Sequence, residues 1–287
     1  MPQLAVVGQP ISHSLSPRMQ TAALKACGLA GEWTYGALEL DPEEFAVAID
    51  QLSGDRSWAG VNVTIPHKAA ALEVASEASA AAQAIGAANT LSFHRAEGER
   101  PRISADNTDA PAIVDAVKAA GTDPAGARAL VLGAGGSARA AVWALREAGA
   151  EVSVWNRTFE RGAALAEELG AGVVAEGAAP MPGEFAVLVN TTAVGLGADG
   201  ASREPGATFK ALGFEADQLN EQHVVVDLSY GSAETELIRV AKGRGARTVD
   251  GLEILVRQGA RSFKIWTGLE PPLEAMEQAV RPPGARR

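Results

Sequence analysis

Leu130-Val131-Leu132-Gly133-Ala134-Gly135-Gly136-Ser137-Ala138 is an apolar run followed by the pattern G-x-G-x-x-A. Gly133 permits a tight turn, Gly135 lets the backbone approach a pyrophosphate, and Ala138 allows a helix to pack closely on a sheet. The N-terminus of that helix is a site for anions. Glycines alone are weak evidence in a chain that has 31 of them, and a tight structural turn is the alternative. The order of strand, turn and helix therefore carries the prediction of a Rossmann-type dinucleotide site.

The next predicted strand indicates which dinucleotide binds. A site for NAD usually has Asp or Glu at the end of this strand, where the carboxylate binds the ribose 2′-hydroxyl. Here the strand ends in Val154-Trp155-Asn156-Arg157-Thr158, and Arg161 follows about one helical turn later. A guanidinium and a hydroxyl suit the 2′-phosphate of NADP. The alternative is a solvated helix start that contains an Arg by chance.

Strand and helix signals alternate along the chain, which predicts the α/β class with parallel strands and right-handed crossovers. The 287 residues exceed the usual size of one domain, and the turn-rich segment 121–126 divides them into two α/β blocks. We expect strands at residues 4–8, 33–40, 61–64, 89–95, 101–104, 128–132, 151–155, 173–174, 185–190, 224–228 and 247–249. Helices are expected at 16–27, 42–52, 76–85, 108–120, 137–148, 160–169, 234–242 and 252–267, with one more beginning at Pro66. Ser16 and Asp41 are the expected N-caps of the first two helices, and residues 281–287 are expected to be disordered.

The composition narrows the classes of partner. The net charge is −10, which argues against nucleic acid or an anionic membrane. An anionic dinucleotide then requires local basic residues, and Arg157 and Arg161 meet that requirement. Cys27 is the only cysteine, so an intrachain disulfide is impossible. The N-terminus lacks a signal-peptide pattern, and no apolar stretch approaches the ~18 residues of a membrane helix. We therefore expect a cytoplasmic protein.

The first block concentrates short polar side chains beside turns and strand ends, in the runs 12–17, 62–68, 89–90 and 106–109. Because ligands of open α/β sheets bind beyond the carboxyl ends of strands, these groups suit a ligand rich in hydroxyls. A Lys near an Asp could exchange a proton with a carbinol oxygen. Taken singly, each residue has a structural alternative: Ser16 and Asp109 could be helix caps. Asp106 could be a turn former, and Lys68 a surface lysine. No thiol pair, His cluster or acidic ligand set suggests a metal.

Eight regions of the chain closely resemble the shikimate dehydrogenase family, in that family's order, and the resemblance spans residues 4 to about 266. They are Ser14-Leu15-Ser16-Pro17, Asn62-Val63-Thr64-Ile65-Pro66-His67-Lys68, Gly86-Ala87-Ala88-Asn89-Thr90, Asn107-Thr108-Asp109, Gly133–Ala138, Asn156-Arg157-Thr158, Asn190-Thr191-Thr192, and Asp250-Gly251-Leu252 with Gln258-Gly259-Ala260. The run N-V-T-I-P-H-K is highly specific, whereas the glycine run alone is not. The resemblance implies the NADPH-dependent, reversible reduction of 3-dehydroshikimate to shikimate in aromatic amino acid biosynthesis, the chorismate pathway.

The resemblance also implies roles for individual residues. Lys68 and Asp109 are similar to the family's catalytic pair, with Lys68 the proton donor to the carbonyl oxygen. Substrate contacts are implied for the carboxylate binders Ser14, Ser16 and Tyr230, and for the ring-hydroxyl ligands Thr64, Asn89 and Gln258. The implied NADP site consists of Gly133, Ala134, Gly135, Gly136, Ser137, Ala138, Asn156, Arg157, Thr158 and Arg161, with Thr191, Leu228 and Gly251 at the nicotinamide end.

In this family the C-terminal helices return to the substrate domain. The resemblance therefore implies a discontinuous substrate-binding domain, residues 1–111 and 252–287, with a mixed, mainly parallel sheet. Residues 112–251 would form a Rossmann-type NADP-binding domain. The resemblance implies a small-molecule substrate, and we expect a monomer or homodimer.

The chain departs from the family's pattern after Asp109, where the family commonly has G-x-G-[FL] and this chain has Ala110-Pro111-Ala112-Ile113. Two methionines that are common in the family are replaced by Leu196 and Ile254. These residues keep an apolar surface, so we expect different packing rather than lost activity. Three alternatives stay open: an NAD-linked quinate/shikimate dehydrogenase, a non-catalytic binding relative, and an aminoshikimate enzyme.

Overall fold

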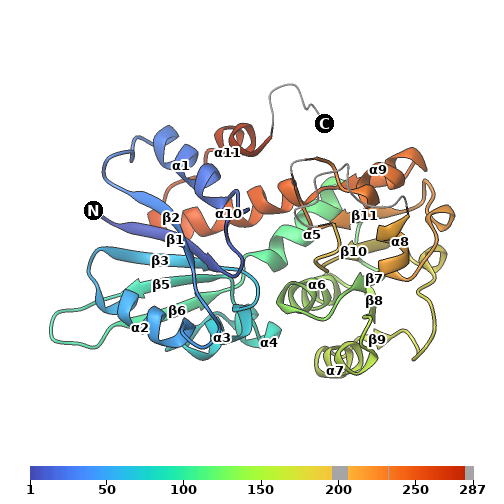
Figure 1. Cartoon of the computed structure of the whole chain (residues 1–287), viewed down its shortest axis with the longest axis horizontal. Helices are drawn as coiled ribbons and strands as arrows, with labels where there is room; N and C mark the ends of the chain where they lie inside the picture. Colours follow the sequence, from blue (N-terminus) through green and yellow to red (C-terminus); the bar gives the residue numbers. More distant parts are fainter. Residues whose placement is uncertain (196–205, 232, 282–287) are drawn as a thin grey trace. The chain divides into compact units, whose positions relative to one another are not determined.

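Two compact units make up the chain in the computed structural model, which describes residues 1–195, 206–231 and 233–281. One unit consists of Met1–Thr108 and Leu255–Arg287, and the other of Asp109–Ile254. Each unit contains one six-stranded sheet with helices packed against it (Figure 1). The class is therefore α/β, as the sequence predicts. Leu196 and the tail 282–287 lie outside the described residues.

The sheet of the first unit is mixed, with the strand order β2-β1-β3-β5-β6-β4. β1 is parallel to β2 and β3, and β4 to β6, whereas β5 is antiparallel to both β3 and β6. The strands are β1 (Gln3–Gly8), β2 (Thr34–Glu39), β3 (Trp58–Val63), β4 (Glu77–Ala78), β5 (Thr90–His94) and β6 (Arg102–Asp106). Because β5 runs antiparallel to β3, the start of β5 and the end of β6 lie at the sheet edge where β1 and β3 end.

Helices cover both faces of this sheet (Figure 1). α2 (Phe45–Gly54), α3 (Lys68–Glu73) and α4 (Ala80–Ile85) share one apolar cluster with alternate residues of β1 and β3, such as Val7 and Val61. The other face is covered by α1 (Ser16–Ala26), α11 (Leu273–Val280) and the part of α10 (Gly251–Thr267) that belongs to this unit. Gly259 allows α10 to approach α1, because a Cβ at this position would lie 2.2 Å from Cε of Met19.

The sheet of the second unit is parallel throughout, with the strand order β12-β11-β10-β7-β8-β9. Counted from β7 as the first strand, this is the order 3-2-1-4-5-6 of dinucleotide-binding sheets, which places the reversal of strand order between β7 and β10. The strands are β7 (Arg128–Leu132), β8 (Glu151–Trp155), β9 (Gly172–Val173), β10 (Val187–Asn190), β11 (Val224–Asp227) and β12 (Arg247–Val249). The observed bounds of β7, β8 and β12 are those that the sequence predicts.

Two apolar layers enclose this parallel sheet. α5 (Asp109–Ala119), α6 (Gly136–Glu147) and α7 (Phe159–Leu169) pack with Ala129 and Val131 on one face. α8 (Ala207–Leu212) and α9 (Glu236–Gly243) pack with Leu130 and Leu132 on the other. Successive residues of a strand point to opposite faces, which is why the uninterrupted apolar run of β7 serves both layers. Two short 3-10 turns, Pro182–Glu184 and Ala216–Gln218, lie in the connections.

Several expected helix starts are wrong. α3 begins at Lys68 rather than at Pro66, and α9 begins at Glu236 rather than at Glu234. Ser16 is the first residue of α1, and the N-cap is Leu15, which makes no side-chain capping bond. α2 begins at Phe45 rather than next to Asp41, because the segment between them forms a turn. In that turn the Asp41 carbonyl accepts the amides of Glu44 and Phe45, each at 3.1 Å.

The segment 76–85 is only partly helical. Ser76 bonds to Ile103 through its amide (2.9 Å) and its hydroxyl, and this pairing continues into β4. Ser79 then caps α4 by accepting the amide of Ala82 at 3.2 Å. The sequence analysis did not predict β4, α8 or α11, which are short elements without a long apolar period.

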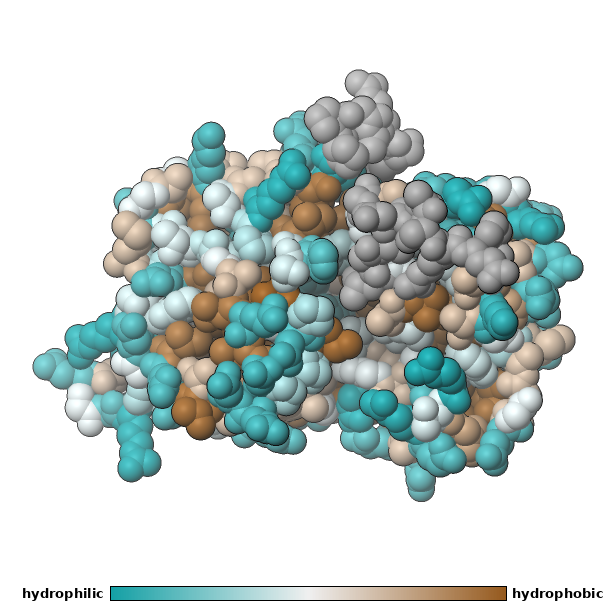
Figure 2. All heavy atoms as spheres, in the orientation of Figure 1, coloured by the Kyte–Doolittle hydropathy of each residue, from teal (hydrophilic) through white to brown (hydrophobic). Residues whose placement is uncertain are grey.

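Apolar side chains reach the surface in several separate places on the face that Figure 2 shows. The large side chains that are exposed are Met1, Val47, Ile65, Val173, Met181, Ile265, Leu269 and Leu273. In the described segments, every helix is too short or too polar to cross a lipid bilayer.

Candidate active site

Polar segments of the first unit meet at one edge of its sheet. The amide of Thr64, just after β3, donates to the carbonyl of Val7 in β1 at 2.9 Å. The amide of Asn89, just before β5, donates to the carbonyl of Asp106 at the end of β6 at 3.0 Å. The edge where β1 and β3 end is therefore lined by the polar runs that the sequence analysis singled out.

Three hydroxyls at this edge are available to a ligand. Ser14 Oγ accepts the amide of Ser16 at 3.3 Å, so the hydroxyl proton of Ser14 has no acceptor among the described residues. The side chains of Ser16 and Thr64 make no hydrogen bond within the described part of the chain. Ser16 as a whole residue is only 5% exposed, but its hydroxyl oxygen is not among the buried polar atoms of the described residues that lack a partner. Hydroxyls with unused protons are suitable donors to a carboxylate or a carbinol.

Lys68 is the first residue of α3 and is half-buried. Its carbonyl accepts the amide of Ala88 at 2.8 Å, which ties the start of the helix to the segment before β5. The preceding residue, His67, is buried and stacks on Phe45 with 4.6 Å between the ring centroids. His67 Nε2 also lies 2.8 Å from the carbonyl of Leu40. These contacts fix the backbone from which the Lys68 side chain extends.

Asn89 and Gln258, the two expected amide ligands, are brought together. Asn89 Oδ1 accepts the amide of Thr108 at 2.8 Å, and its Nδ2 donates to Thr108 Oγ1 at 3.0 Å. The same Nδ2 lies 3.3 Å from Gln258 Oε1 on α10. Gln258 Nε2 donates to the carbonyl of Leu255 at 2.9 Å. Both amides are therefore held in one orientation by bonds within the protein.

Sequence reasoning missed the buried side chains that support Asn89. Asn62 Nδ2 donates to Ser262 Oγ at 2.9 Å and to Thr90 Oγ1 at 3.2 Å, and Asn62 Oδ1 accepts the Tyr35 hydroxyl at 2.7 Å. Thr90 Oγ1 lies 2.8 Å from Ser262 Oγ and 3.1 Å from Asn89 Oδ1. The signal in the sequence was the presence of polar residues inside the predicted strands 61–64 and 89–95, because a buried side-chain amide needs hydrogen-bond partners.

Asp109 and Tyr230 belong to the second unit. Asp109 directly follows Thr108, is the first residue of α5, and is 6% exposed. Tyr230 is half-buried and follows β11. Ala110, Ala112 and Ile113, which depart from the family's pattern, form the buried face of α5 together with the residues one turn later. Ile254 is buried in the core of the same unit.

The glycine-rich turn lies at the end of β7. Gly133 has a φ of +117°, a conformation that favours glycine, and a Cβ there would lie 2.5 Å from Thr191 Oγ1. Gly135 is the N-cap of α6, and nothing lies within 4 Å of the position of a Cβ. Ala138 is buried in the core. The backbone of the turn is therefore open toward the N-terminus of α6, where anions bind favourably.

The basic residues follow the neighbouring strand, β8. Asn156 Nδ2 donates to the carbonyl of Thr158 at 2.7 Å, which shapes the turn into α7. Arg157, Thr158 and Arg161 are exposed. Neither guanidinium forms an ion pair or a hydrogen bond with any residue that the structure describes. Because β7 and β8 are adjacent and parallel, Arg157 in the turn after β8 and Arg161 in the first part of α7 follow the strand next to the one that ends in the glycine-rich turn.

The residues expected at the nicotinamide end lie at the ends of β10 and β11 and at the start of α10. Thr191 donates to the carbonyl of Leu132 through its amide (2.9 Å) and its hydroxyl (2.8 Å). A Cβ on Gly251 would lie 2.7 Å from the carbonyl oxygen of Leu228 and 2.5 Å from that of Ser229. Gly251 therefore lets α10 begin directly against the turn after β11.

Asp227, the last residue of β11, is a further polar residue that sequence reasoning missed. Its side chain is fully buried and accepts bonds from Asn190, Ser229 and Thr235. Burial raises the pKa of Asp227 to about 6, against the effect of these hydrogen bonds, which lower it. An acid at the end of the apolar run V-V-V-D was the only signal in the sequence.

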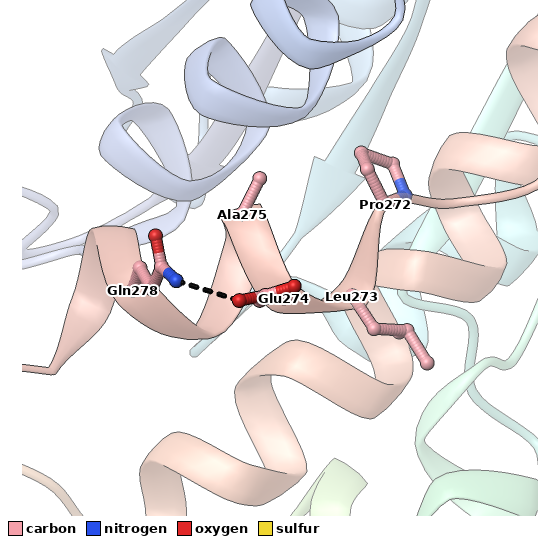
Figure 3. Close-up of a pocket in the computed structure, with 5 residues that line it drawn as sticks. All are labelled: Pro272, Leu273, Glu274, Ala275 and Gln278. Carbon is pink, nitrogen blue, oxygen red and sulfur yellow. Dashed lines mark hydrogen bonds between the residues drawn. The ribbon is translucent and has the colours of Figure 1, made fainter.

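Other features lie apart from these residues. Among the described residues, no group of three or more His, Cys, Asp or Glu side chains could hold a metal ion. A shallow hollow of about 440 Å³ lies on α11 (Figure 3). It is lined by Pro272, Leu273, Glu274, Ala275 and Gln278, and Gln278 Nε2 donates to Glu274 Oε1 at 3.0 Å. None of these residues belongs to the expected substrate or cofactor site.

Three family models match the chain. Residues 6–91 match the shikimate dehydrogenase substrate binding domain, and residues 115–181 match shikimate / quinate 5-dehydrogenase. Residues 251–281 match the shikimate 5'-dehydrogenase C-terminal domain. The matches cover both units.

Known proteins resemble the chain over almost its whole length. A shikimate dehydrogenase (NADP(+)) of Thermus thermophilus is 43% identical over 281 residues, which are 98% of each chain. The crystal structure of shikimate 5-dehydrogenase from Thermus thermophilus, in complex with NADP(H) and shikimate, has a TM-score of 0.81 at 42% identity and covers 97% of this chain and 98% of that one. The ligand-free 5-ketofructose reductase of Gluconobacter sp. strain CHM43 has a TM-score of 0.80 at 28% identity and covers 96% of both chains.

Proposed function

Because this chain belongs to the shikimate dehydrogenase family, we propose that it catalyses the NADP-dependent, reversible reduction of 3-dehydroshikimate to shikimate. The observation that carries the proposal is the 43% identity to a shikimate dehydrogenase (NADP(+)) over 98% of both chains. This reaction belongs to the biosynthesis of aromatic amino acids.

The second unit fits NADP. The glycine-rich turn has an open side at Gly135 and leads into the N-terminus of α6, which suits the pyrophosphate. The guanidiniums of Arg157 and Arg161, which bond to none of the described residues, suit the 2′-phosphate, because Arg can engage phosphate with two donors. Asn156 and Thr158 complete this end of the site, while Thr191, Leu228 and Gly251 would lie along the nicotinamide.

The polar edge of the first unit fits the substrate. We assign the carboxylate to Ser14, Ser16 and Tyr230, and the ring hydroxyls to Thr64, Asn89 and Gln258. Support comes from the unused hydroxyl protons of the two serines and Thr64 and from the mutual contact of the two amides. Neutral donors and acceptors in fixed positions discriminate strongly against a ligand that lacks the matching hydroxyl.

Lys68 and Asp109 are the proposed catalytic pair. When bound, NADPH supplies the hydride that the carbonyl carbon receives. The Lys68 ammonium gives a proton to the carbonyl oxygen during reduction, and takes it back when shikimate is oxidised. The buried carboxylate of Asp109, which follows the anchored Thr108, is assigned to hold the ammonium in place. The rigid start of α3 supports the assignment of Lys68.

The division of labour between the two parts of the chain belongs to the same proposal. Residues 1–111 and 252–287 bind the substrate, and residues 112–251 bind NADP. The compact units and the match of residues 6–91 to a substrate binding domain support this division. A monomeric or homodimeric enzyme in the cytoplasm completes the proposal.

The decisive experiment follows absorbance at the nicotinamide band with shikimate or quinate, each offered NADP and NAD. We expect the highest kcat/KM for shikimate with NADP. Equal or better turnover of quinate with NAD would favour the quinate-type alternative, which the wording of one family model also covers. Absence of turnover with all four combinations, in a folded sample, would favour the non-catalytic alternative.

A further inference from the structure

Asp227 connects three segments beyond the ends of β10 and β11. Its Oδ1 accepts Asn190 Nδ2 at 2.8 Å and the amide of Ser229 at 3.1 Å. Its Oδ2 accepts the hydroxyl of Thr235 at 2.7 Å. Thr235 is in turn the N-cap of α9, where its hydroxyl accepts the amide of Ile238 at 3.3 Å. One carboxylate therefore holds a strand end, a turn and a helix start.

The contacts continue into the two turns. Asn190 Oδ1 accepts the amide and the hydroxyl of Thr192, at 3.0 and 2.7 Å. Ser229 Oγ donates to the carbonyl of Thr192 at 3.0 Å. The turn after β10 is thus bonded directly to the turn after β11, and both are bonded to Asp227 through Asn190 and Ser229.

We propose that Asp227 is a positioning residue, which sets the two turns and through them Thr191 and Leu228 at the nicotinamide end of the cofactor site. The inference rests on the proposed function, because only that function gives this end of the site a nicotinamide. Asp227 itself touches no reacting atom, since it is fully buried below the turns. Its effect passes through the backbone of its neighbours.

If Asp227 only filled space and accepted hydrogen bonds, a neutral residue could do the same and would destabilise the fold less. The carboxylate has no basic partner among the described residues, and its contacts are neutral donors. Burying an ion without a counter-charge opposes folding, and this is why the pKa of Asp227 is raised. A charged acceptor in turn gives hydrogen bonds that are roughly twice as strong as neutral ones. The stability that is lost by burying this carboxylate is explained if the cofactor site requires the two turns to be held in fixed positions.

The test compares Asp227→Asn with two further variants. Asn keeps the shape, removes the charge and replaces one acceptor oxygen with a donor. Thr235→Val removes two bonds of the hydroxyl, the one to Asp227 and the one from the amide of Ile238, and Thr235→Ser should restore both. The matched control is His223→Ala, at the other end of β11, where His223 bonds the amide of Asn220 (3.0 Å) and lies 3.1 Å from the carbonyl of Pro182. This control also breaks a buried polar cluster, but far along the strand from the turns.

The first readout is amide hydrogen exchange of Thr192 and Ser229 in the protein without cofactor, followed by the Kd for NADP from calorimetry. We expect exchange at both amides to rise about tenfold or more in Asp227→Asn, the equivalent of weakening a charge-assisted bond. The Kd for NADP should change less than about threefold, because the turn after β7 and Arg157 are untouched. His223→Ala should leave both amides as protected as in the wild type, once global stability is taken into account.

The second readout is kinetic. In Asp227→Asn and Thr235→Val, kcat should fall about tenfold with KM for NADP nearly unchanged, and Thr235→Ser should recover kcat. Unchanged exchange in folded Asp227→Asn, or equal changes in His223→Ala, would overturn the proposal. If the wild type proves inactive on shikimate, the proposed function fails. The exchange data then still decide whether Asp227 fixes the turns.

Discussion

The polar edges of the two units are built in opposite ways. In the first unit, neutral side chains bond to one another in a buried network around Asn62, Asn89, Thr90 and Ser262. In the second unit, the edge consists of glycine backbone and of guanidiniums that bond to no described residue, and the buried carboxylate of Asp227 supports it. A network of neutral, satisfied hydrogen bonds is fixed before a ligand arrives and is insensitive to pH and salt. Binding at an edge that is built from charged groups depends on pH and on salt.

The largest effect is expected from removing the side chain of Lys68, the one charged group that is proposed to act at the polar edge of the first unit. Lys68→Ala should lower kcat by about 10²–10⁴, the usual contribution of a positioned acid or base. KM for shikimate and for NADP should change much less, because the network around Asn89 stays intact. Asp109→Asn should be severely impaired as well. Steady-state kinetics with both substrates varied measures this, with Lys25→Ala, an exposed lysine of α1, as the control. Near-normal turnover in Lys68→Ala would show that another group donates the proton.

The sequence predicted most of the cofactor edge and little of what supports either edge. The strand, turn and helix around Gly133 were predictable because each glycine has a local reason that can be read from its neighbours. Arg157 and Arg161 could be singled out because an anionic cofactor needs local positive charge in a chain with a net charge of −10, and their contact with the cofactor stays a prediction. Such features depend on residues that are close in the chain.

The support of the two edges was not predictable because it depends on distant residues. Ser262 and Asn62 are 200 positions apart in the chain, and their contact exists only because α10 returns to the first sheet. That return followed from the family resemblance and not from the strand and helix signals. Asp227 looked like an ordinary strand end, and its burial depends on the packing of α9 and the turn after β10. The late start of α2 was missed because Asp41 and Pro42 also suit a turn.

The second prediction uses pH to distinguish the edge of the second unit, where Asp227 is buried, from the neutral network of the first unit. The folded-state pKa of Asp227 is about 6, above its usual value near 3.8, because the side chain is buried. Between these two values the folded protein holds a proton that the unfolded chain has released. The free energy of unfolding contributed by Asp227 should therefore fall as pH rises from about 4 to about 6, by on the order of 3 kcal/mol at most.

Urea unfolding at pH 4.5, 5.5 and 6.5 for the wild type and Asp227→Asn measures this contribution as a difference. The stability of the wild type relative to the variant should decline across the series. The same comparison with Asn62→Ala should give a difference that does not change across this pH range, because the side chains that bond to Asn62 include no carboxyl or imidazole group. A flat difference for Asp227→Asn would mean that the carboxyl titrates at its usual value.

The third prediction concerns charge at the cofactor edge. Arg157→Ala should raise KM for NADP by about ten- to a hundredfold, since one charge-assisted bond to phosphate contributes about 1.5–3 kcal/mol. NAD lacks the 2′-phosphate, so its KM should hardly change, and Arg157→Asp should go further by repelling the phosphate. The ratio of kcat/KM for the two cofactors, at low and high salt, is the measurement. Arg244→Ala, an exposed arginine at the end of α9, is the control. Equal weakening of NADP and NAD would contradict the assignment of Arg157.

The smallest effect is expected at the neutral edge, in Ser262→Ala. Ser262 is fully buried, but Asn62 Nδ2 keeps two other acceptors, Thr90 Oγ1 at 3.2 Å and the Asn89 carbonyl at 3.1 Å. The free energy of unfolding should therefore fall by only about 1–2 kcal/mol, equally at pH 5 and pH 7. KM for shikimate should rise several-fold through Asn89, while KM for NADP stays constant. Ser53→Ala is a matched control, because the hydroxyl of this buried serine of α2 donates to the carbonyl of Asp50 at 2.8 Å and to no other described residue, so the change should affect stability alone. A change in the KM for NADP in Ser262→Ala would mean that the two edges are not independent.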